Sequence, residues 1–200
     1  MITRQQGLPL FLLNTVFFPE QRLPLRVFEA RYLDMVSACF KSGSPFGICL
    51  IRRGAEVGEA AEPETVGTLA HIEKWDMPQQ GVLHVLARGG RRFEVERAEQ
   101  RGKLTVADVS LWSEEPPVPV PESDRELSDF LRRIMLEVGD DLVPEPYRFD
   151  DAGWVGMRLA QLLPVDNRRK QAWLAERAPL MRLGSIRDTL TTLARSNGAP

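Results

Sequence analysis

The sequence predicts an α+β fold, in which a small mixed β-barrel with one early helix precedes a small bundle of C-terminal helices. Two observations predict the barrel: short apolar strands recur between turn residues up to residue 113, and one helical repeat interrupts them. A third predicts the bundle, because apolar residues beyond residue 122 recur at spacings of three and four. We therefore expect a β domain at 1–113, a proline-rich linker at 114–122 and a helical domain at 123–200.

The first fifty residues predict two strands, a helix and a third strand. Residues 8–13 are almost wholly apolar, which is typical of a strand buried on both faces, and 23–27 resume a period of two. The period then changes, which predicts a helix at 29–41, and 46–51 form another apolar strand. The predicted apolar face of the helix consists of Phe28, Tyr32, Val36 and Cys39.

The middle of the chain predicts four more short strands, because apolar and polar residues alternate there between clusters of Gly and Pro. The expected strands are 66–75, 82–88, 92–97 and 104–111. Residues 55–63 are expected to form a loop, and the turns between strands are expected at 76–81, at Gly89-Gly90 and at 100–102.

Four prolines stand within 116–121, and proline neither pairs inside a sheet nor continues a helix, so we expect an extended linker. Four helices are predicted after it. Ser123 is the expected N-cap of the first, Asp150-Asp151 opens the second and Asp166 caps the third. Pro179 suits the first turn of the last helix.

The segment LPLFLLNTVFFPEQRLPLRVFEARY at 8–32 resembles the opening of the Lon protease N-terminal domain. The resemblance depends on the combination of Leu-Pro-Leu, Phe-Pro, a second Leu-Pro-Leu and Phe-Glu-x-Arg-Tyr. Further similar segments follow in the family's order, namely GICLIRRGAEVG, VGTLAHIEKW, LARGGRRFEVE and LTVADVSLW. Residues 150–171 are similar to the helical extension of stand-alone bacterial Lon-N proteins. The resemblance implies a PUA-like β-fold that recruits substrates.

Composition narrows the function classes. A formal net charge of −2 argues against a dedicated nucleic-acid binder, which usually has a basic domain. Cys39 and Cys49 make no disulfide framework and are expected to be buried, reduced thiols. The N-terminus lacks the features of a signal peptide, and no apolar run approaches the roughly 18 residues of a membrane span. We therefore expect a cytoplasmic protein with no membrane partner.

The sequence shows no catalytic motif, so we expect no enzyme activity and no cofactor. The P-loop pattern of an ATPase is absent, and all four lysines stand in polar stretches or at strand ends, where a pKa low enough for a Ser-Lys peptidase site is not expected. His71 and His84 match no zinc spacing with the two cysteines, so no metal is expected. Tyr32 is expected to pack in the core, with Glu29 and Arg31 in ion pairs.

Two apolar turns, at 16–19 and at 75–78, and one basic segment, at 88–103, are candidates for partner binding. An exposed apolar turn often marks an interface, although both turns could instead pack over the barrel mouth or against the helices. The segment 88–103 carries six cations against three glutamates, which favours either contact with RNA or a solvated, self-paired strand face. The proposed partner-binding residues are Val16, Phe17, Phe18, Trp75, Met77, Arg88, Arg91 and Arg92.

The leading hypothesis is a non-enzymatic module that holds unfolded or flexible polypeptide segments in an apolar groove or along a sheet edge, as the resemblance implies. An RNA-binding PUA-like module is the alternative, and a small enzyme with an unrecognised site is a third interpretation. The sequence leaves open whether a protease or chaperone is a further partner and whether the chain forms homo-oligomers.

Overall fold

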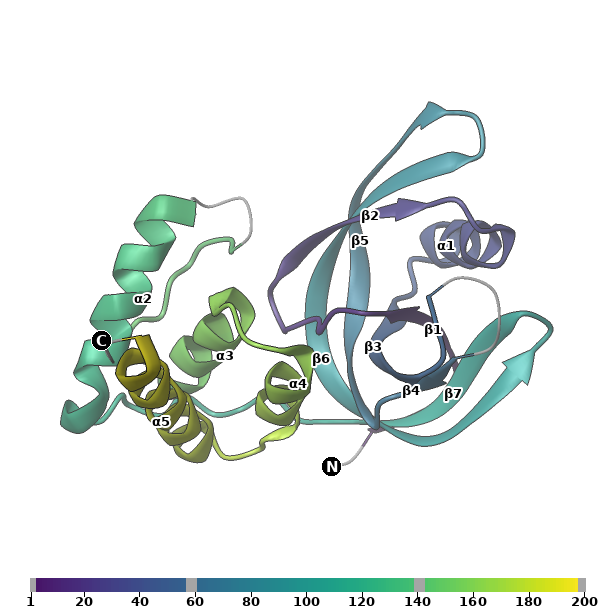
Figure 1. Ribbon diagram of the computed structural model, residues 1–200. Coiled ribbons are helices and arrows are strands. Elements are labelled where there is room, and N and C mark those ends of the chain that lie inside the picture. Colours follow the sequence, from purple (N-terminus) through teal and green to yellow (C-terminus); the bar gives the residue numbers. More distant parts are fainter. Residues whose placement is uncertain (1–2, 57–60, 139–142, 198–200) are drawn as a thin grey trace. The chain divides into compact units, whose positions relative to one another are not determined.

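The computed structural model describes residues 3–56, 61–138 and 143–197 (Figure 1). The chain divides into two compact units between Glu114 and Glu115. The strands and one helix form the first unit, and the remaining helices form the second. The middle of the loop expected at 55–63 lies outside the described residues.

One sheet of seven strands makes up most of the first unit in the part of the chain that the structure describes. The strands are β1 Thr3–Leu13, β2 Arg22–Val27, β3 Phe46–Arg53, β4 Glu62–Pro63, β5 Val66–Gln79, β6 Val82–Arg101 and β7 Leu104–Leu111. Their order is β1-β7-β6-β5-β3-β4, and β1 also pairs in parallel with β3, which closes a mixed barrel. The predicted fold class is therefore confirmed.

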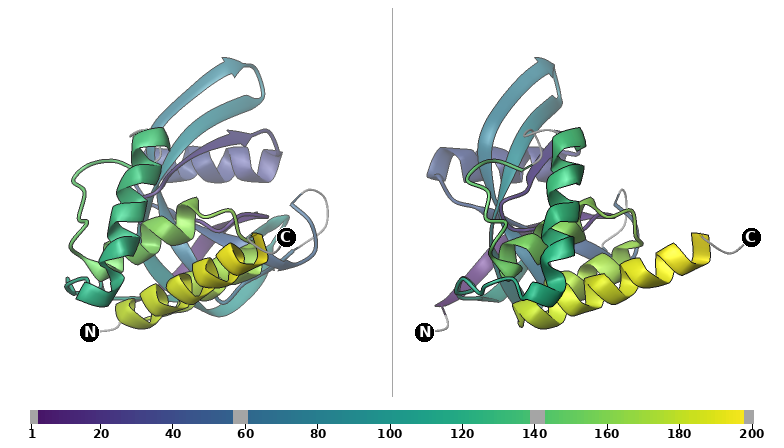
Figure 2. Two further views of the ribbon diagram at one scale, coloured as in Figure 1. Left: turned by 60° about the vertical axis from the view of Figure 1, so that its left-hand side comes forward. Right: turned by 90° about the vertical axis from the view of Figure 1, so that its left-hand side faces the viewer.

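The long strand β6 changes its partner along its length. Residues 83–88 pair with β2, residues 93–101 pair with β7, and β5 pairs with β6 along both parts. We call the three strand segments 22–27, 71–79 and 82–88 the arm. Figures 1 and 2 show that the β5–β6 hairpin of the arm extends beyond the barrel.

The prediction of turns at 76–81 and at Gly89-Gly90 is wrong in large part. β5 continues to Gln79, so that only Gln80 and Gly81 turn, and β6 passes through Gly89 without reversing. The Gly89 N–H donates to the Gln21 carbonyl at 2.9 Å, and the Gly89 carbonyl accepts from the Glu20 N–H at 2.8 Å. A Cβ on Gly89 would lie 2.1 Å from the Phe18 carbonyl oxygen, so the glycine is needed for close approach of two backbones.

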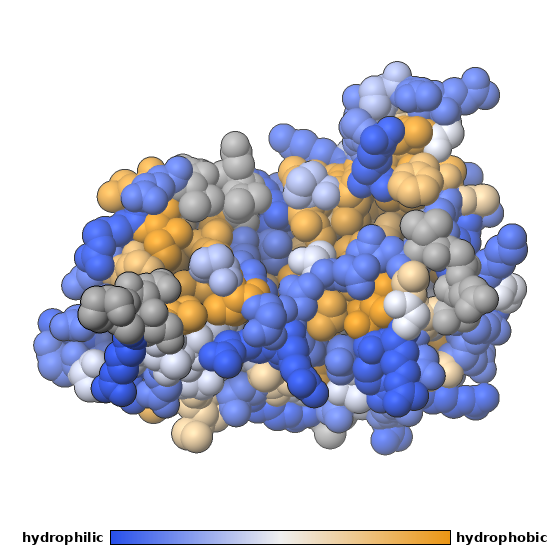
Figure 3. All heavy atoms as spheres, viewed as in Figure 1, coloured by the Kyte–Doolittle hydropathy of each residue, from blue (hydrophilic) through white to orange (hydrophobic). Residues whose placement is uncertain are grey.

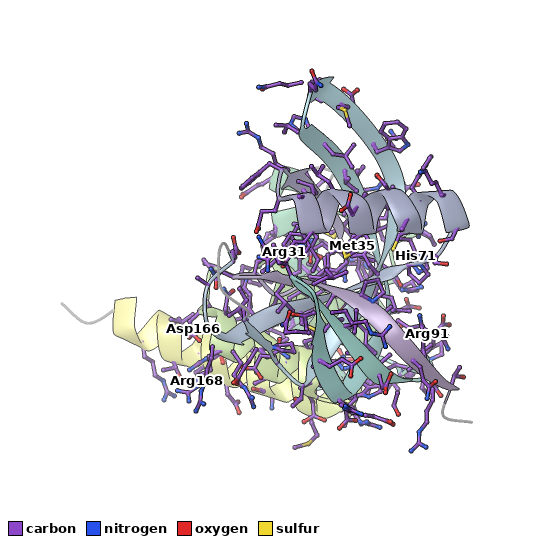
Figure 4. The ribbon with its side chains drawn as sticks, turned by 90° about the vertical axis from the view of Figure 1, so that its right-hand side faces the viewer. Arg31, Met35, His71, Arg91, Asp166 and Arg168 are labelled. Atoms are coloured by element: carbon purple, nitrogen blue, oxygen red, sulfur yellow. The ribbon has the colours of Figure 1, made fainter. Side chains whose placement is uncertain are left out.

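Helix α1, Ala30–Ser42, packs its apolar face against the arm and the barrel, and Gly43 ends it with a φ of 65°. Tyr32, Met35, Val36 and Cys39 are buried in a cluster that also contains Phe11 and Phe46. Figure 4 labels Met35 on this helix. The prediction that Phe28 belongs to the buried face of the helix is wrong, because this residue precedes the helix and is 55% exposed. A second cluster, around Leu10 and Phe93, fills the barrel.

The second unit contains a short 3-10 helix and four α-helices among the described residues. They are η1 Glu122–Asp124, α2 Arg125–Val138, α3 Ala152–Leu162, α4 Asn167–Ala175 and α5 Pro179–Asn197. The predicted helix starts at Asp151 and Asp166 are confirmed, because these carboxylates accept from the N–H groups of Gly153 and Arg169, and Figure 4 labels Asp166 at the start of α4. The N-cap predicted at Ser123 is wrong, because this residue lies inside η1.

The proline-rich segment is part of the second unit and hydrogen-bonds within it. Pro119 forms an isolated bridge with Asp151, the Ala152 N–H donates to the Val118 carbonyl at 2.7 Å, and the Val120 N–H donates to the Asp150 carbonyl at 2.9 Å. These bonds use a carbonyl and the N–H group of the intervening valines, and the prolines at 116–121 belong to no named strand or helix, as expected.

A buried arginine forms hydrogen bonds with several segments of the second unit. Arg182 is fully buried, and both of its terminal nitrogens donate to the carboxylate of Glu115. Its Nε donates to the Trp173 carbonyl at 3.0 Å, and Nη2 also donates to the Glu176 carbonyl. This arrangement joins α4, α5 and the segment that precedes the prolines.

We expect Gly89→Ala to destabilise the protein by about 2–4 kcal/mol, because overpacking here displaces backbone rather than a side chain. Gly90→Ala is the matched control, since its Cβ would meet the ring of the exposed His71, which can rotate away, and we expect a loss below about 1 kcal/mol. Urea denaturation measures both values. Equal losses for the two variants would refute the role assigned to Gly89.

We expect Glu115→Gln to destabilise the protein by about 3 kcal/mol, because it leaves the buried Arg182 charge uncompensated. Glu122→Gln is the control, since Glu122 pairs with Arg125 at the surface and its removal should cost less than about 1 kcal/mol. Denaturation followed by tryptophan fluorescence compares the two variants, and a change of the same size in both would count against a structural role for Glu115.

Candidate functional site

Exposed aromatic and methionine side chains gather where the arm leaves the cover of α1. Phe40 is 52% exposed, and Trp75 and Met77 are each 49% exposed. The Phe40 and Trp75 rings meet edge to face, with centroids 5.3 Å apart. We call these three residues the apolar patch, and Figure 3 shows apolar side chains at the surface beside the hairpin. Exposed apolar groups of this size are typical of an interaction surface.

The register of the arm explains why Trp75 lies at the edge of the core. Trp75 pairs with Val85, and Val85 pairs with Leu25. Directly paired residues project from the same face of a sheet, and both Val85 and Leu25 are buried. Trp75 is therefore the exposed continuation of a buried face of the arm.

A cleft of about 240 Å³ lies between the end of β1, strand β2 and the start of α1. Phe11, Leu25 and Tyr32 supply apolar lining, and Glu29 and Glu56 supply carboxylates. Among the strands that the structure describes, β2 pairs with β6 alone, and residues 23–27 line the cleft along β2. An extended segment can add to such a strand edge, although Pro24 removes one backbone donor from it.

The start of α1 is fixed by stacked and charged groups. The Tyr32 ring stacks on Phe11 with centroids 4.0 Å apart, and the Arg31 guanidinium lies 4.6 Å from the centroid of the Tyr32 ring. Arg31 also pairs with Glu29 at 2.9 Å and donates to the Lys103 carbonyl at 3.1 Å. Burial raises the pKa of the Tyr32 phenol, and Arg31 opposes this rise. The predicted structural roles of Glu29, Arg31 and Tyr32 are confirmed.

The first predicted apolar turn is not exposed. Val16, Phe17 and Phe18 are buried to 3% exposure or less, and the Thr68 hydroxyl donates to the Phe17 carbonyl at 2.6 Å. The expectation that these three side chains offer an exposed interface is therefore wrong, because they pack inside the first unit. Trp75 and Met77 are exposed, on a strand rather than in a turn, and their contact with a partner stays a prediction.

Some cations of the basic segment 88–103 are exposed, and others are buried or form ion pairs. Arg88 and Arg91 are exposed, whereas Arg92 is buried with its guanidinium 4.6 Å from the centroid of the Trp112 ring. Arg92 is therefore a wrong candidate for direct contact. Farther along β6, Arg97 and Arg101 both pair with Glu99, at 3.4 and 3.0 Å. This part of the segment is a self-paired strand face.

One lysine differs from the sequence expectation. Burial lowers the pKa of Lys170, which contradicts the prediction that no lysine has such an environment. Its Nζ donates to the Gln161 carbonyl at 2.9 Å, so the contact is with a carbonyl rather than with a serine hydroxyl. A Ser-Lys pair is therefore not formed by this contact.

The two histidines stand apart on the arm, since His71 pairs with Arg88 and His84 pairs with Asp76. Within 3–56, 61–138 and 143–197, no group of three His, Cys, Asp or Glu side chains is arranged to hold a metal ion. Over the same described residues, no helix is long and apolar enough to cross a membrane.

Sequence reasoning missed Phe40 and the cleft. Phe40 directly follows the buried positions Tyr32, Val36 and Cys39, so it lies beside the apolar stripe of α1. An aromatic residue next to such a stripe is the one signal that the sequence offers. The cleft has no local signal, because it is lined by the end of β1, by β2 and by the start of α1.

Comparison with known proteins identifies the family. The model of the ATP-dependent protease La (LON) substrate-binding domain matches residues 7–192. The structure is similar to that of a Lon N-terminal domain protein from Xanthomonas campestris, with a TM-score of 0.77, 37% identity and coverage of 92% of this chain and 97% of that chain.

The N-terminal domain of the Mycobacterium avium complex Lon protease shares the fold, with a TM-score of 0.62 at 17% identity over 92% of this chain and 97% of that one. No curated protein sequence matches the chain. The family model spans more than half of the sequence, and it extends across both units. The chain therefore belongs to the family of Lon substrate-binding domains.

Proposed function

We propose that the chain is a non-catalytic module that binds flexible polypeptide segments through the apolar patch of Phe40, Trp75 and Met77. The exposure of these three large side chains is the observation that carries the proposal, because a segment that covers them removes apolar surface from water. The family description, which names a substrate-binding domain of an ATP-dependent protease, supports the same class of function.

The geometry of the patch suits a flexible segment. Phe40 and Trp75 already contact each other edge to face, so part of the ordering cost of their side chains is met before a ligand binds. The hairpin that carries Trp75 and Met77 extends beyond the barrel and is accessible to a long chain (Figure 2). A loosely folded polypeptide can place one or two apolar side chains here without fitting a deep pocket.

The family description also bears on partners and location. A protease is the partner that we propose for the later handling of a bound segment, since the family is described as part of an ATP-dependent protease. The buried free thiols Cys39 and Cys49 fit a reducing cytoplasm, where we place the protein. The RNA-binding alternative has weaker support, because Arg92 is buried and Arg97 and Arg101 share Glu99.

We expect the double variant Trp75→Ser/Met77→Ser to bind an unstructured apolar peptide at least about tenfold more weakly than the native chain. A large apolar side chain that is fully covered by the peptide contributes roughly 1.5–3 kcal/mol to the free energy of binding. A loss of about 1.4 kcal/mol raises the dissociation constant tenfold. Fluorescence anisotropy with a labelled peptide measures the dissociation constant, and a sequence-scrambled polar peptide measures unspecific binding.

Met181→Ser is the matched control, since Met181 is an exposed methionine on α5. We expect its affinity to stay within about twofold of the native value, as for a surface substitution outside the site. If the native chain does not distinguish the apolar peptide from the polar one, or if the control loses as much as the double variant, the proposed function is wrong.

A further inference from the structure

The face of the arm opposite the core carries a separate set of side chains. In the register of the three strands, one set of positions points to the core, as in the rows Leu23–Ala87–Ile72 and Leu25–Val85–Trp75. The alternate positions of β2 and β6 point away from it, and so do the β5 residues paired with them, where the register shifts between Ile72 and Lys74. They form the rows Arg22–Arg88–His71, Pro24–Leu86–Lys74 and Arg26–His84–Asp76. We call these nine residues, with Glu73, the basic face.

The basic face is positive, although the chain as a whole is negative. Its four cations are Arg22, Arg26, Lys74 and Arg88, and its two carboxylates are Glu73 and Asp76, which leaves a charge of +2 with both histidines neutral. The whole sequence has a formal charge of −2. Partial burial, and to a lesser extent the neighbouring Arg88, lower the pKa of His71.

Most of these cations are available to a ligand. Arg22 is occupied, because its Nε and Nη2 donate to the two oxygens of Glu73 at 2.9 and 2.7 Å. Arg26, Lys74 and Arg88 are exposed, and none of them forms an ion pair within the described residues. Lys74 and Arg88 also interact electrostatically with Glu73 and help to lower its pKa, but the hydrogen bonds of that carboxylate come from Arg22. Three exposed cations therefore surround the apolar pair Pro24 and Leu86 at the centre of the face.

We infer that the basic face binds acidic residues that flank, in the same polypeptide segment, the apolar residues bound at the patch, so that the bound segment contacts both faces of the arm. This inference rests on the proposed function and adds the substrate class, which is an apolar segment flanked by Asp or Glu. Charge complementarity supports it, since the exposed cations of the basic face match the carboxylates of such a segment.

Strand geometry favours a polypeptide as the occupant. Alternate residues of an extended segment project to one side at intervals of roughly 6.6–6.8 Å, which equals the spacing of the outward positions along β2 and along the β6 part of the arm. Nucleic acid is disfavoured, because the basic face carries no Phe, Tyr or Trp on which a base could stack. The aromatic residue of the arm, Trp75, projects from the opposite face.

Two labelled peptides of identical length test the inference on the full chain. Both carry the same apolar centre, one with Glu and the other with Gln at the flanking positions. We expect the Glu peptide to bind about tenfold more tightly in dilute salt, and we expect this preference to vanish near 0.5 M salt, at which charges are screened within roughly 4–5 Å. Fluorescence anisotropy gives both dissociation constants.

The double variant Arg26→Glu/Lys74→Glu should remove the preference and leave the affinity for the Gln peptide within about twofold. Arg4→Glu/Arg97→Glu is the matched control, because it makes the same change of charge at exposed positions of the barrel strands β1 and β6 and should keep the preference. An equal loss in both double variants would show a general charge effect and overturn the inference.

The outcomes separate the inference from the proposed function. If the Gln peptide binds through Trp75 and Met77 but the Glu peptide is not preferred, the inference is wrong and the proposed function stands. If neither peptide binds, both are wrong. Tighter binding of a single-stranded RNA oligonucleotide, lost in Arg26→Glu/Lys74→Glu, would assign the basic face to nucleic acid and also overturn the inference.

Discussion

The contact between Gly89 and the corner at residues 18–21 is the constraint on which the first unit depends. Two backbone hydrogen bonds join Gly89 to Glu20 and Gln21, and a side chain at Gly89 would collide with the Phe18 carbonyl. Before this point β6 pairs with β2, and after it β6 pairs with β7. One continuous strand therefore belongs to both the arm and the barrel, so the barrel core holds the arm in place.

This constraint gives the arm two different surfaces. Side chains such as Leu25 and Val85 are buried beneath α1, and the same face becomes exposed at Trp75 and Met77, where the arm extends past the helix. The opposite face never contacts the core and carries charged groups. A single hairpin thus offers apolar contact on one side and positive charge on the other, which is a suitable combination for holding a flexible chain of mixed composition.

The second unit is organised by a buried charge rather than by an apolar core alone. Arg182 satisfies its donors with Glu115 and with two carbonyls of the α4 region, so the segment before the prolines is part of the helical unit. Removal of either partner of such a buried pair leaves an uncompensated charge, so the helical unit depends on both residues. The family model covers 7–192, so this unit belongs to the family's domain as much as the barrel does.

The sequence by itself determined the local elements and the family, because periodicity, helix caps and short motifs are local signals. It identified β1, β2, α1 and β3, the helix starts at Asp151 and Asp166, and the similarity to Lon N-terminal domains. Exposure was decided only by the tertiary structure. Phe17 and Trp75 are both large apolar residues in segments predicted as turns, yet partners distant in sequence bury the first and leave the second half exposed. The continuation of β6 through Gly89 was also decided by the tertiary structure. A glycine pair predicts a turn, but here the glycine allows the backbone of another segment to lie against the strand.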